Sequence, residues 1–200
     1  MSTLILATTN PNKIEKLRWI MEDYFEDIKP QSQSIDVEET ETNFEGNAAL
    51  KAVEISKLYH CYAVATDGGV LIPALGDAWN AIFTKRFLGK DNVTDIDRIE
   101  GLLELMKDKK GDERKIMWRE AIALAHNGRL LFSTEVDGDE GVIQTSYDPA
   151  QYAPGIWRCT LTAYPQFGNK NFFELNEDER KYSEISWYRL KEMIDRFMES

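Results

Sequence analysis

The sequence has few of the residues on which several classes of function depend. Its 200 residues include two cysteines, Cys61 and Cys159, and two histidines, His60 and His126. The cysteines lie far apart and lack the spacing of metal ligands, so neither a disulfide framework nor a zinc site is indicated. We expect both thiols to be buried as small hydrophobic side chains.

Basic residues and long apolar runs are also scarce. The chain has 24 Lys and Arg against 35 Asp and Glu, which gives a formal net charge of −11. Because proteins bind nucleic acid polymers through clustered basic residues, this charge argues against such a partner. A local pocket of lysines, or a divalent cation, can still hold one small anion. The first apolar run, residues 4–7, is too short for a signal peptide, and no stretch approaches a membrane span. We therefore expect a cytoplasmic protein with no membrane partner.

What remains is the composition of a globular protein. Hydrophobic residues make up 42% of the chain and aromatic residues 11%, enough to bury a sizeable core in a chain of this length. No internal repeat, low-complexity tract or linker interrupts the sequence. Residues 1–200 are therefore predicted to form a single domain.

The first part of the chain alternates strand and helix patterns. A strand over residues 3–7 precedes a helix that Asn10 caps. A second helix is predicted over residues 43–58, and a buried strand over 61–65 that stops at the turn residues 66–69. This alternation predicts a sheet with helices on its faces.

The second part is predicted to be richer in strands. After a helix capped by Thr94, residues 115–145 read as an antiparallel meander of three runs, the first two joined by a type I′ turn at Asn127-Gly128. Residues 147–167 lack clear periodicity and are predicted to be loop with short strands. A closing amphipathic helix is predicted over residues 183–198.

The turn after the first strand has the features of an anion site. The start of a helix presents unpaired N–H groups and a positive dipole end. Thr8, Thr9 and Asn10 add side-chain donors there, and Lys13 adds a positive charge one turn later. Phosphate is the natural ligand of such a turn. The alternative is a capped helix with a solvated lysine, since the turn lacks the glycines of a phosphate loop.

Carboxylates form a second candidate cluster. Glu38 and Glu39 precede the second predicted helix, and Asp67 follows a buried strand, where ligands bind in open α/β sheets. Mg²⁺ prefers oxygen ligands and needs only one or two carboxylates in addition to substrate phosphates. The alternative is that the glutamates are a solvated acidic run and Asp67 forms a turn.

These stretches, in order, resemble the motifs of one family. Residues 6–13 look like an opening strand followed by a Thr-x-Asn-x-x-Lys phosphate loop. Residues 38–52 are similar to Glu-Glu-Thr…Phe-x-Glu-Asn-Ala-x-x-Lys-Ala, and residues 65–70 to Ala-Asp-Asp-Ser-Gly-Leu with Asp67 as the retained second aspartate. Residues 85–87 match a stretch that carries an arginine, here Arg86. The family is that of the inosine triphosphate pyrophosphatases.

The chain also departs from the family's motifs. Gly46 stands where the family has Glu, and Thr66 stands where it has the first aspartate. In the second half the family's Gly-Phe-Gly-Tyr-Asp-Pro is missing, since the nearest text, residues 154–159, has no aspartate. Residues 186–189 lack the histidine of the family's Ser-His-Arg, whose side chains contact the purine. We therefore expect the base preference to be altered.

The resemblance implies a fold and a mechanism. The implied fold is α/β, with a mixed twisted sheet flanked by helices and a second, β-rich lobe, and the implied partner is a second copy of the chain in a homodimer. In the implied mechanism, Glu39 and Asp67 would hold Mg²⁺, which would supply positive charge for the phosphates, and water would attack the α-phosphorus of a nucleoside triphosphate so that pyrophosphate leaves. Asp67 and Lys13 are the implied catalytic residues. The implied substrate-binding residues are Thr8, Thr9, Asn10, Lys13, Lys51, Arg86 and Trp187.

Three hypotheses of different classes follow. The first is a Mg²⁺-dependent nucleoside triphosphate pyrophosphohydrolase with altered base specificity. The second is a degenerate relative that binds a nucleotide or another phosphorylated ligand without hydrolysing it. The third is a structural or partner-binding protein. Trp157, Trp187 and Tyr188 offer aromatic rings for a base, although aromatic residues in helices and strands more often belong to the core.

Overall fold

The computed structural model describes residues 2–32, 35, 37, 41–83, 88–89, 93–152 and 155–200, except for the side chain of Phe83. Within these residues, seven strands form one sheet in the order β2-β1-β3-β4-β5-β6-β7. β1 pairs in parallel with β2 and β3, whereas β6 pairs antiparallel with β5 and β7. The expected α/β fold with a mixed sheet is confirmed. The strands are β1 (Thr3–Leu6), β2 (Asp27–Pro30), β3 (Tyr62–Leu71), β4 (Lys115–His126), β5 (Arg129–Ile143), β6 (Thr162–Tyr164) and β7 (Lys170–Asn171).

The starts of the longer helices follow from their capping residues. The side chain of Asn10 accepts a hydrogen bond from the backbone of Asn12, and Asn43 caps the next helix in the same way. Thr94 and Asp97 form a reciprocal capping box, so two backbone donors at that helix start are satisfied. No helix among the described residues is long and apolar enough to cross a membrane. The α-helices are α1 (Pro11–Met21), α2 (Phe44–Tyr59), α3 (Asp95–Leu105), α4 (Trp157–Leu161), α5 (Glu177–Ser183) and α6 (Ile185–Met198).

The chain divides into two compact units, and neither is continuous in sequence. Unit 1 comprises residues 1–68, 119–137 and 186–200, and unit 2 comprises residues 69–118 and 138–185. β3, β4 and β5 each contribute residues to both units.

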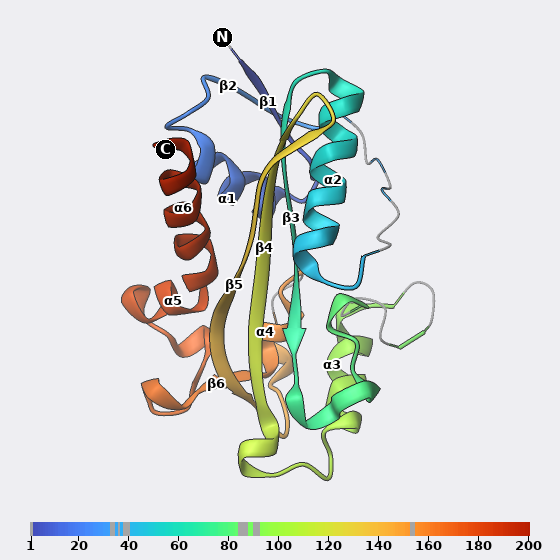
Figure 1. Cartoon of the computed structure of the whole chain (residues 1–200). Helices are drawn as coiled ribbons and strands as arrows, with labels where there is room; N and C mark the ends of the chain where they lie inside the picture. The colour runs from blue at the N-terminus through green and yellow to red at the C-terminus, as the bar shows by residue number, and fades with distance from the viewer. Residues whose placement is uncertain are drawn as a thin grey trace. The chain divides into compact units, whose positions relative to one another are not determined.

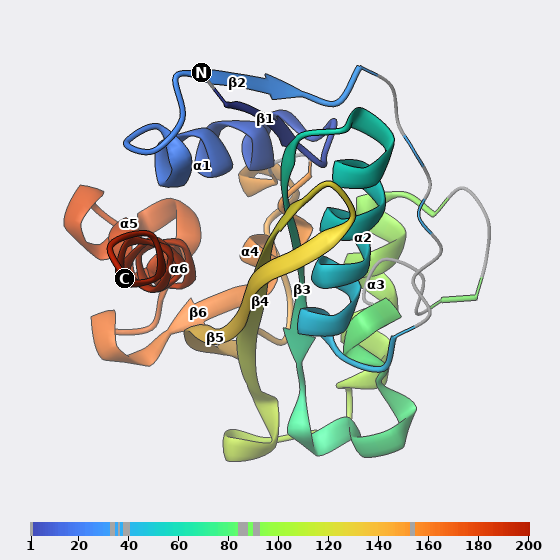
Figure 2. The same cartoon turned by 45° about the horizontal axis from the view of Figure 1, so that its top comes forward.

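The core of unit 1 has helices on both sides of its strands. On one side, Leu6 of β1 and Val64 of β3 pack in a cluster with Leu17 of α1 and Leu190 of α6. On the other, Ala63 of β3 belongs to a cluster with Ile5 and with Ile55 of α2. Figures 1 and 2 show α2 on the opposite side of β3 from α1 and α6. Alternate residues of each strand therefore face different helices, as the pleat of a strand requires.

Unit 2 has its own core, built from helices as well as strands. Ile99 and Leu102 of α3 pack with Trp157 of α4 and with Val70 of β3. Arg114 is buried in this unit, and its guanidinium donates to the backbone oxygens of Met106, Ile143 and Gln144 at 2.5, 2.6 and 2.7 Å. Burial lowers the pKa of Arg114. Because α3, α4 and α5 belong to this unit, the expectation of a β-rich lobe is wrong in composition, and the unit is mixed.

Two predicted turns lie inside strands. The strand expected to stop at residues 66–69 continues to Leu71, and β5 runs without a break through Gly138, where a third run of the meander was expected to begin. In each case the glycine allows a close approach of neighbouring strands. A Cβ atom at Gly138 would lie 3.1 Å from the side chain of Trp118, and one at Gly68 would lie 2.8 Å from the backbone oxygen of Arg119. Glycine inside a strand has this use as well as a role in turns.

Other local predictions had mixed outcomes. The turn at Asn127-Gly128 is confirmed, since both residues have the positive φ angles, 49° and 81°, that a type I′ turn requires. β2 was not predicted. Within residues 147–167 the structure contains the short helix α4 as well as β6, and the closing helical segment consists of two helices, α5 and α6, rather than one.

Candidate active site

The polar turn between β1 and α1 holds its shape through its own side chains. The backbone N–H of Ala7 still donates to Val64 of β3, at 2.8 Å. Beyond it, Thr8 Oγ1 accepts from the backbone of Asn10 at 3.1 Å, and Asn10 Oδ1 accepts from Asn12 at 3.0 Å. Thr9 is exposed. The structure thus brings the three predicted phosphate-binding residues together immediately before α1.

Lys13 reaches from the first turn of α1 to the strands. Its Nζ donates to Thr66 Oγ1 on β3 and to Glu120 Oε1 on β4, each at 3.1 Å. The Glu120 side chain is 1% exposed and that of Lys13 is 27% exposed. Almost fully buried carboxylates are rare unless they are paired, so Lys13 explains how Glu120 is tolerated in the strand.

Sequence reasoning missed Glu120. The signal was available, because Glu120 lies directly before the apolar run of residues 121–125, every one of which is buried. An acid in such a strand points to a buried pairing. The sequence does not say that the partner is Lys13, which is 107 residues away along the chain.

A second pair joins α2 to β3. Lys51 Nζ donates to Asp67 Oδ1 at 3.1 Å, and the two side chains are 18% and 15% exposed. The other carboxylate oxygen, Asp67 Oδ2, is buried and has no hydrogen-bond partner within the described part of the chain. A buried acceptor without a donor costs about 1–3 kcal/mol. A cation or a donor from a ligand would remove that penalty.

The two lysines therefore meet β3 at successive residues, from opposite sides. Val64, two residues before Thr66, faces α1, and Ala65, two residues before Asp67, follows the alternation of Ala63 toward α2. β1 pairs with β3 only as far as Leu6, which lies opposite Val64. Beyond that point no strand among the described residues pairs with this edge of β3. Lys13 and Lys51 thus flank one stretch of strand edge at the carboxyl end of β1.

The residues of this stretch fit Mg²⁺ in part. Asp67 offers a carboxylate oxygen that has no hydrogen-bond partner within the described residues, and such an oxygen is the donor type that this ion prefers. Among the described residues there is no group of three or more His, Cys, Asp or Glu able to hold a metal ion. Magnesium sites do not need so many, because substrate phosphates and water complete the shell. Glu38, Glu39 and Arg86 lie outside the described residues, so their predicted roles stay predictions.

Position 46, where the family motif has Glu, lies in the first turn of α2. Gly46 donates its N–H to Asn43 Oδ1 at 2.6 Å. It helps to line a pocket of about 500 Å³, together with Glu45 on the same helix and Ser133 and Glu135 on β5. A Cβ atom at position 46 would lie 2.8 Å from the side chain of Glu41. Glycine therefore fits the local packing at this position.

The aromatic residues considered for base stacking all have packing roles. Trp187 is partly buried against the core of unit 1, and Trp157 is buried in the core of unit 2. Tyr188 is 42% exposed, and its ring contacts that of Trp19 edge to face at 5.2 Å. A role of Trp187 in substrate binding stays a prediction.

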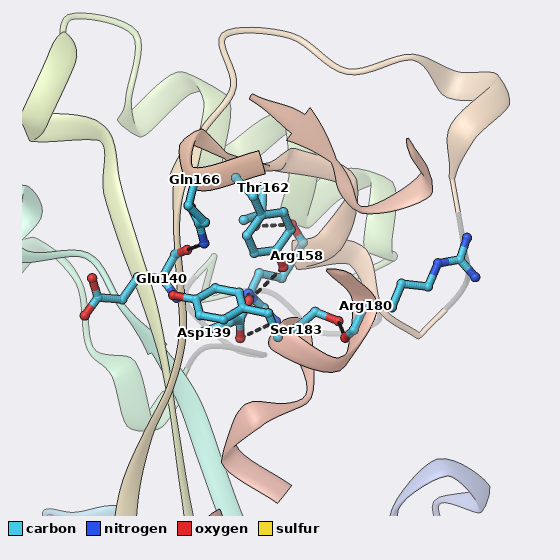
Figure 3. Close-up of polar contacts among 9 residues, drawn as sticks. Asp139, Glu140, Arg158, Thr162, Gln166, Arg180 and Ser183 are labelled. Atoms are coloured by element: carbon cyan, nitrogen blue, oxygen red, sulfur yellow. Dashed lines mark hydrogen bonds and ion pairs between the residues drawn. The ribbon is translucent and has the colours of Figure 1, made fainter. Parts of the chain in front are cut away.

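Unit 2 contains a buried polar network at the start of α4. The guanidinium of Arg158 donates to both oxygens of Asp139 on β5, at 2.8 and 3.2 Å, and Tyr164 donates to Asp139 at 2.7 Å. Figure 3 shows Asp139 directed toward Arg158, whereas the next residue, Glu140, points away. Burial alone would lower the pKa of Arg158, but Asp139 together with the neighbouring Cys159 and Tyr164 raises it above its ordinary value. This network anchors α4, which lies in the segment that stands in place of the family's Gly-Phe-Gly-Tyr-Asp-Pro motif.

Comparison with known proteins gives a consistent result. The model of the Ham1 family matches residues 4–150. The chain is 31% identical over 180 residues to a dITP/XTP pyrophosphatase of Coxiella burnetii, covering 84% of this chain and 89% of that protein. It is 37% identical over 174 residues to a dITP/XTP pyrophosphatase of Photorhabdus laumondii, covering 80% of this chain and 85% of that protein.

Solved structures agree with the sequence comparisons. A Ham1 protein from Coxiella burnetii superposes with a TM-score of 0.80 at 25% identity, covering 98% of this chain and all (100%) of that one. The Ham1 protein of Staphylococcus aureus has the same fold, with a TM-score of 0.77 at 22% identity, and the match covers 96% of this chain and 98% of that one. The resemblance found in the motifs is thus confirmed, and the chain belongs to the Ham1 family.

Proposed function

We propose that the chain is a Mg²⁺-dependent nucleoside triphosphate pyrophosphohydrolase that releases a nucleoside monophosphate and pyrophosphate. One observation carries the proposal. Lys13 and Lys51 reach successive residues of β3 at the carboxyl end of β1, where Asp67 keeps a buried carboxylate oxygen without a partner among the described residues. Ligands of open α/β sheets bind at this end of the strands.

In the proposed mechanism, the chain binds the triphosphate and places a water molecule. The ammonium groups of Lys13 and Lys51 donate to phosphate oxygens, and Asn10 and Thr8 keep the turn before α1 in shape to receive them. Asp67 holds the cation or orients the attacking water, with Glu39 as a second carboxylate for the ion. When bound, Mg²⁺ supplies positive charge against the phosphate oxygens.

The bonds change in a single displacement. The water oxygen bonds to the α-phosphorus, and the bond from that phosphorus to the bridging oxygen breaks. The bridging oxygen leaves with the β- and γ-phosphates as pyrophosphate, and the proton lost by the water passes to solvent. The lysines stabilise the charge that accumulates on the phosphate oxygens.

The proposed substrates are triphosphates of deaminated purines. The supporting argument is the similarity to proteins that are named for dITP and XTP. Residues 186–189 differ from the family's Ser-His-Arg, so we propose a base preference that differs from that of these relatives. A pocket discriminates between bases through buried donors and acceptors that the wrong base leaves unpaired.

The test is a pyrophosphate-release assay on folded protein with Mg²⁺. Inosine, xanthosine and deoxyinosine triphosphates are compared with the four ordinary ones. We expect Asp67→Asn to lower kcat by about 10²-fold or more, and Lys51→Met to lower kcat/KM by a similar factor. Glu104→Gln removes an exposed carboxylate that pairs with Lys107 and serves as the control. Absence of pyrophosphate release from all seven triphosphates contradicts the proposal.

A second candidate function is nucleotide binding without hydrolysis. It is favoured by the fact that Lys13 and Lys51 are each already paired with a carboxylate, which reduces the positive charge offered to a substrate. In that case a triphosphate raises the unfolding temperature without turnover. At a free triphosphate concentration of 100 times Kd, the folded protein is expected to be stabilised by about 2.7 kcal/mol.

The quaternary state is a separate proposal. From the resemblance alone we propose a homodimer formed by a single inosine triphosphatase-like domain over residues 1–200, acting in the cytoplasm. Light scattering on the purified chain measures its mass directly. A mass near 23.1 kDa contradicts the dimer.

A further inference from the structure

Two positions on the Lys13 side of β3 depart from the family motif. In the stretch that resembles Ala-Asp-Asp-Ser-Gly-Leu, the chain has Thr66 in place of the first aspartate and Gly68 in place of the serine. Both positions project on the same side of β3, because they are two residues apart in an extended strand. On that side lies Glu120 of β4, a buried acid that the motif does not contain.

Gly68 leaves the space that the carboxylate of Glu120 occupies. A Cβ atom at position 68 would lie 2.5 Å from Glu120 Oε2 and 2.8 Å from the backbone oxygen of Arg119. Real Cβ atoms do not approach other atoms so closely, and the backbone of a paired strand cannot easily move away. A serine at position 68 would therefore crowd both the carboxylate of Glu120, whose side chain can turn aside, and the backbone oxygen of Arg119, which cannot.

Thr66 and Glu120 bind the same ammonium group. Lys13 Nζ donates to Thr66 Oγ1 and to Glu120 Oε1 at equal distances of 3.1 Å. Thr66 is neutral, so of these two partners only Glu120 carries a negative charge. The ammonium has three donors, of which these bonds use two, and the side chain of Lys13 is 27% exposed.

We propose that the acid lost at position 66 has been relocated to position 120 on the neighbouring strand. Glu120 then acts as a positioning residue, which holds the ammonium of Lys13 in place so that its third donor meets a phosphate oxygen. Gly68 is the accompanying change that makes room for the new carboxylate. This inference rests on the proposed function, because the phosphate oxygen belongs to the proposed substrate.

The relocation predicts a specific coupling between positions 66 and 120. Glu120→Ala leaves Lys13 without its counter-charge, and Thr66→Asp puts two carboxylates around one ammonium. We expect each single change to raise the KM for the triphosphate by about tenfold, a size usual for residues that share one partner. The double variant Thr66→Asp/Glu120→Ala restores one acid beside one lysine. We expect its KM to return to within about threefold of the wild-type value.

A similar coupling is expected at position 68. Gly68→Ser places a side chain against the carboxylate of Glu120, and we expect it to lower the urea midpoint of unfolding. In the Glu120→Ala background the clash with the carboxylate is gone and only the close approach to the backbone oxygen of Arg119 remains, so we expect the same change to lower the midpoint less. Glu120→Gln keeps the volume of the side chain and removes only the charge, so it separates loss of charge from loss of packing. Glu104→Gln again serves as the control.

The outcomes distinguish relocation from a purely structural pair. If Glu120→Ala and Glu120→Gln lower the urea midpoint but leave KM and kcat unchanged, the positioning role is overturned. It is also overturned if the double variant is no better than the worse single variant.

A failure of the proposed function can be distinguished from a failure of the inference about Glu120. If the wild-type protein releases no pyrophosphate, the same variants are compared by calorimetric titration with inorganic pyrophosphate. Binding that Lys13→Met abolishes, Glu120→Ala weakens and the double variant restores supports the relocation. Absence of pyrophosphate binding by the wild-type protein overturns it.

Discussion

Substitution of Asp139 tests the buried network of unit 2. Asp139 is 1% exposed and Arg158 is 12% exposed. The carboxylate accepts two hydrogen bonds from Arg158 and one from Tyr164. Asp139→Asn keeps the shape of the side chain, but it removes the charge opposite the guanidinium and replaces one acceptor oxygen with a donor. The variant therefore leaves a buried positive charge without its partner.

The expected loss of stability is large. Removing one partner of a buried ion pair costs about 3–5 kcal/mol, mainly because the remaining charge stays buried and uncompensated. Since the asparagine retains one acceptor oxygen, we expect the lower end of that range for Asp139→Asn. Replacing both partners, as in Asp139→Leu/Arg158→Met, removes the stranded charge. We expect this double variant to be more stable than Asp139→Asn by about 1–2 kcal/mol.

Urea unfolding at pH 7 measures the change in the free energy of unfolding. This change is the shift in the urea midpoint multiplied by the slope of the free energy against urea concentration. Asp178→Asn is the matched control, because its partner Lys181 and Asp178 itself are both exposed, at 64% and 88%, and such pairs contribute little. A loss below about 1 kcal/mol for Asp139→Asn, equal to that of a surface pair, refutes the assignment of this network as the anchor of α4.

Three further predictions concern individual residues. Burial raises the pKa of Tyr164 above its ordinary value of 10.0. The unfolded chain therefore loses this proton first, and the urea midpoint should fall as the pH rises above 10; Tyr164→Phe should flatten that decline. Burial raises the pKa of both thiols, Cys61 and Cys159, but Cys159 is buried and Cys61 only half-buried, so iodoacetamide at pH 8 should label Cys61 before Cys159, as peptide mass spectrometry can show. Gly128→Ala should cost about 1 kcal/mol in urea unfolding, because Gly128 has a φ of 81°, whereas Gly111→Ala provides a comparison at another positive φ, 52°.

Local signals in the sequence were sufficient where the structure depends on neighbours along the chain. Asn10 and Thr94 cap helices as predicted, and Asn127-Gly128 turns the hairpin. These features involve contacts over two to four residues, so the residue types alone identify them.

Local signals did not predict features that depend on contacts with a neighbouring strand. Gly68 and Gly138 were read as turn residues, but they make room for residues of β4, and nothing near them in the sequence shows which strand lies alongside. Lys13 and Asp67 both lie near the carboxyl end of β1, and their predicted catalytic roles stay predictions. Their actual partners, Glu120 and Lys51, depend on the order of strands and helices, which periodicity does not reveal.

The division of the chain between two units also affects how it can be synthesised. Leu190 and Ile194 of α6 are fully buried (0% exposed) in one cluster with Leu4 and Leu6 of β1. A nascent chain therefore leaves the part of this core that α6 covers exposed until its last helix has left the ribosome, which at about 5–20 residues per second takes on the order of ten seconds or more. A stop codon placed before residue 186 would leave Lys13 and Asp67 on a half-built core, so we expect such a fragment to need a chaperone or to aggregate.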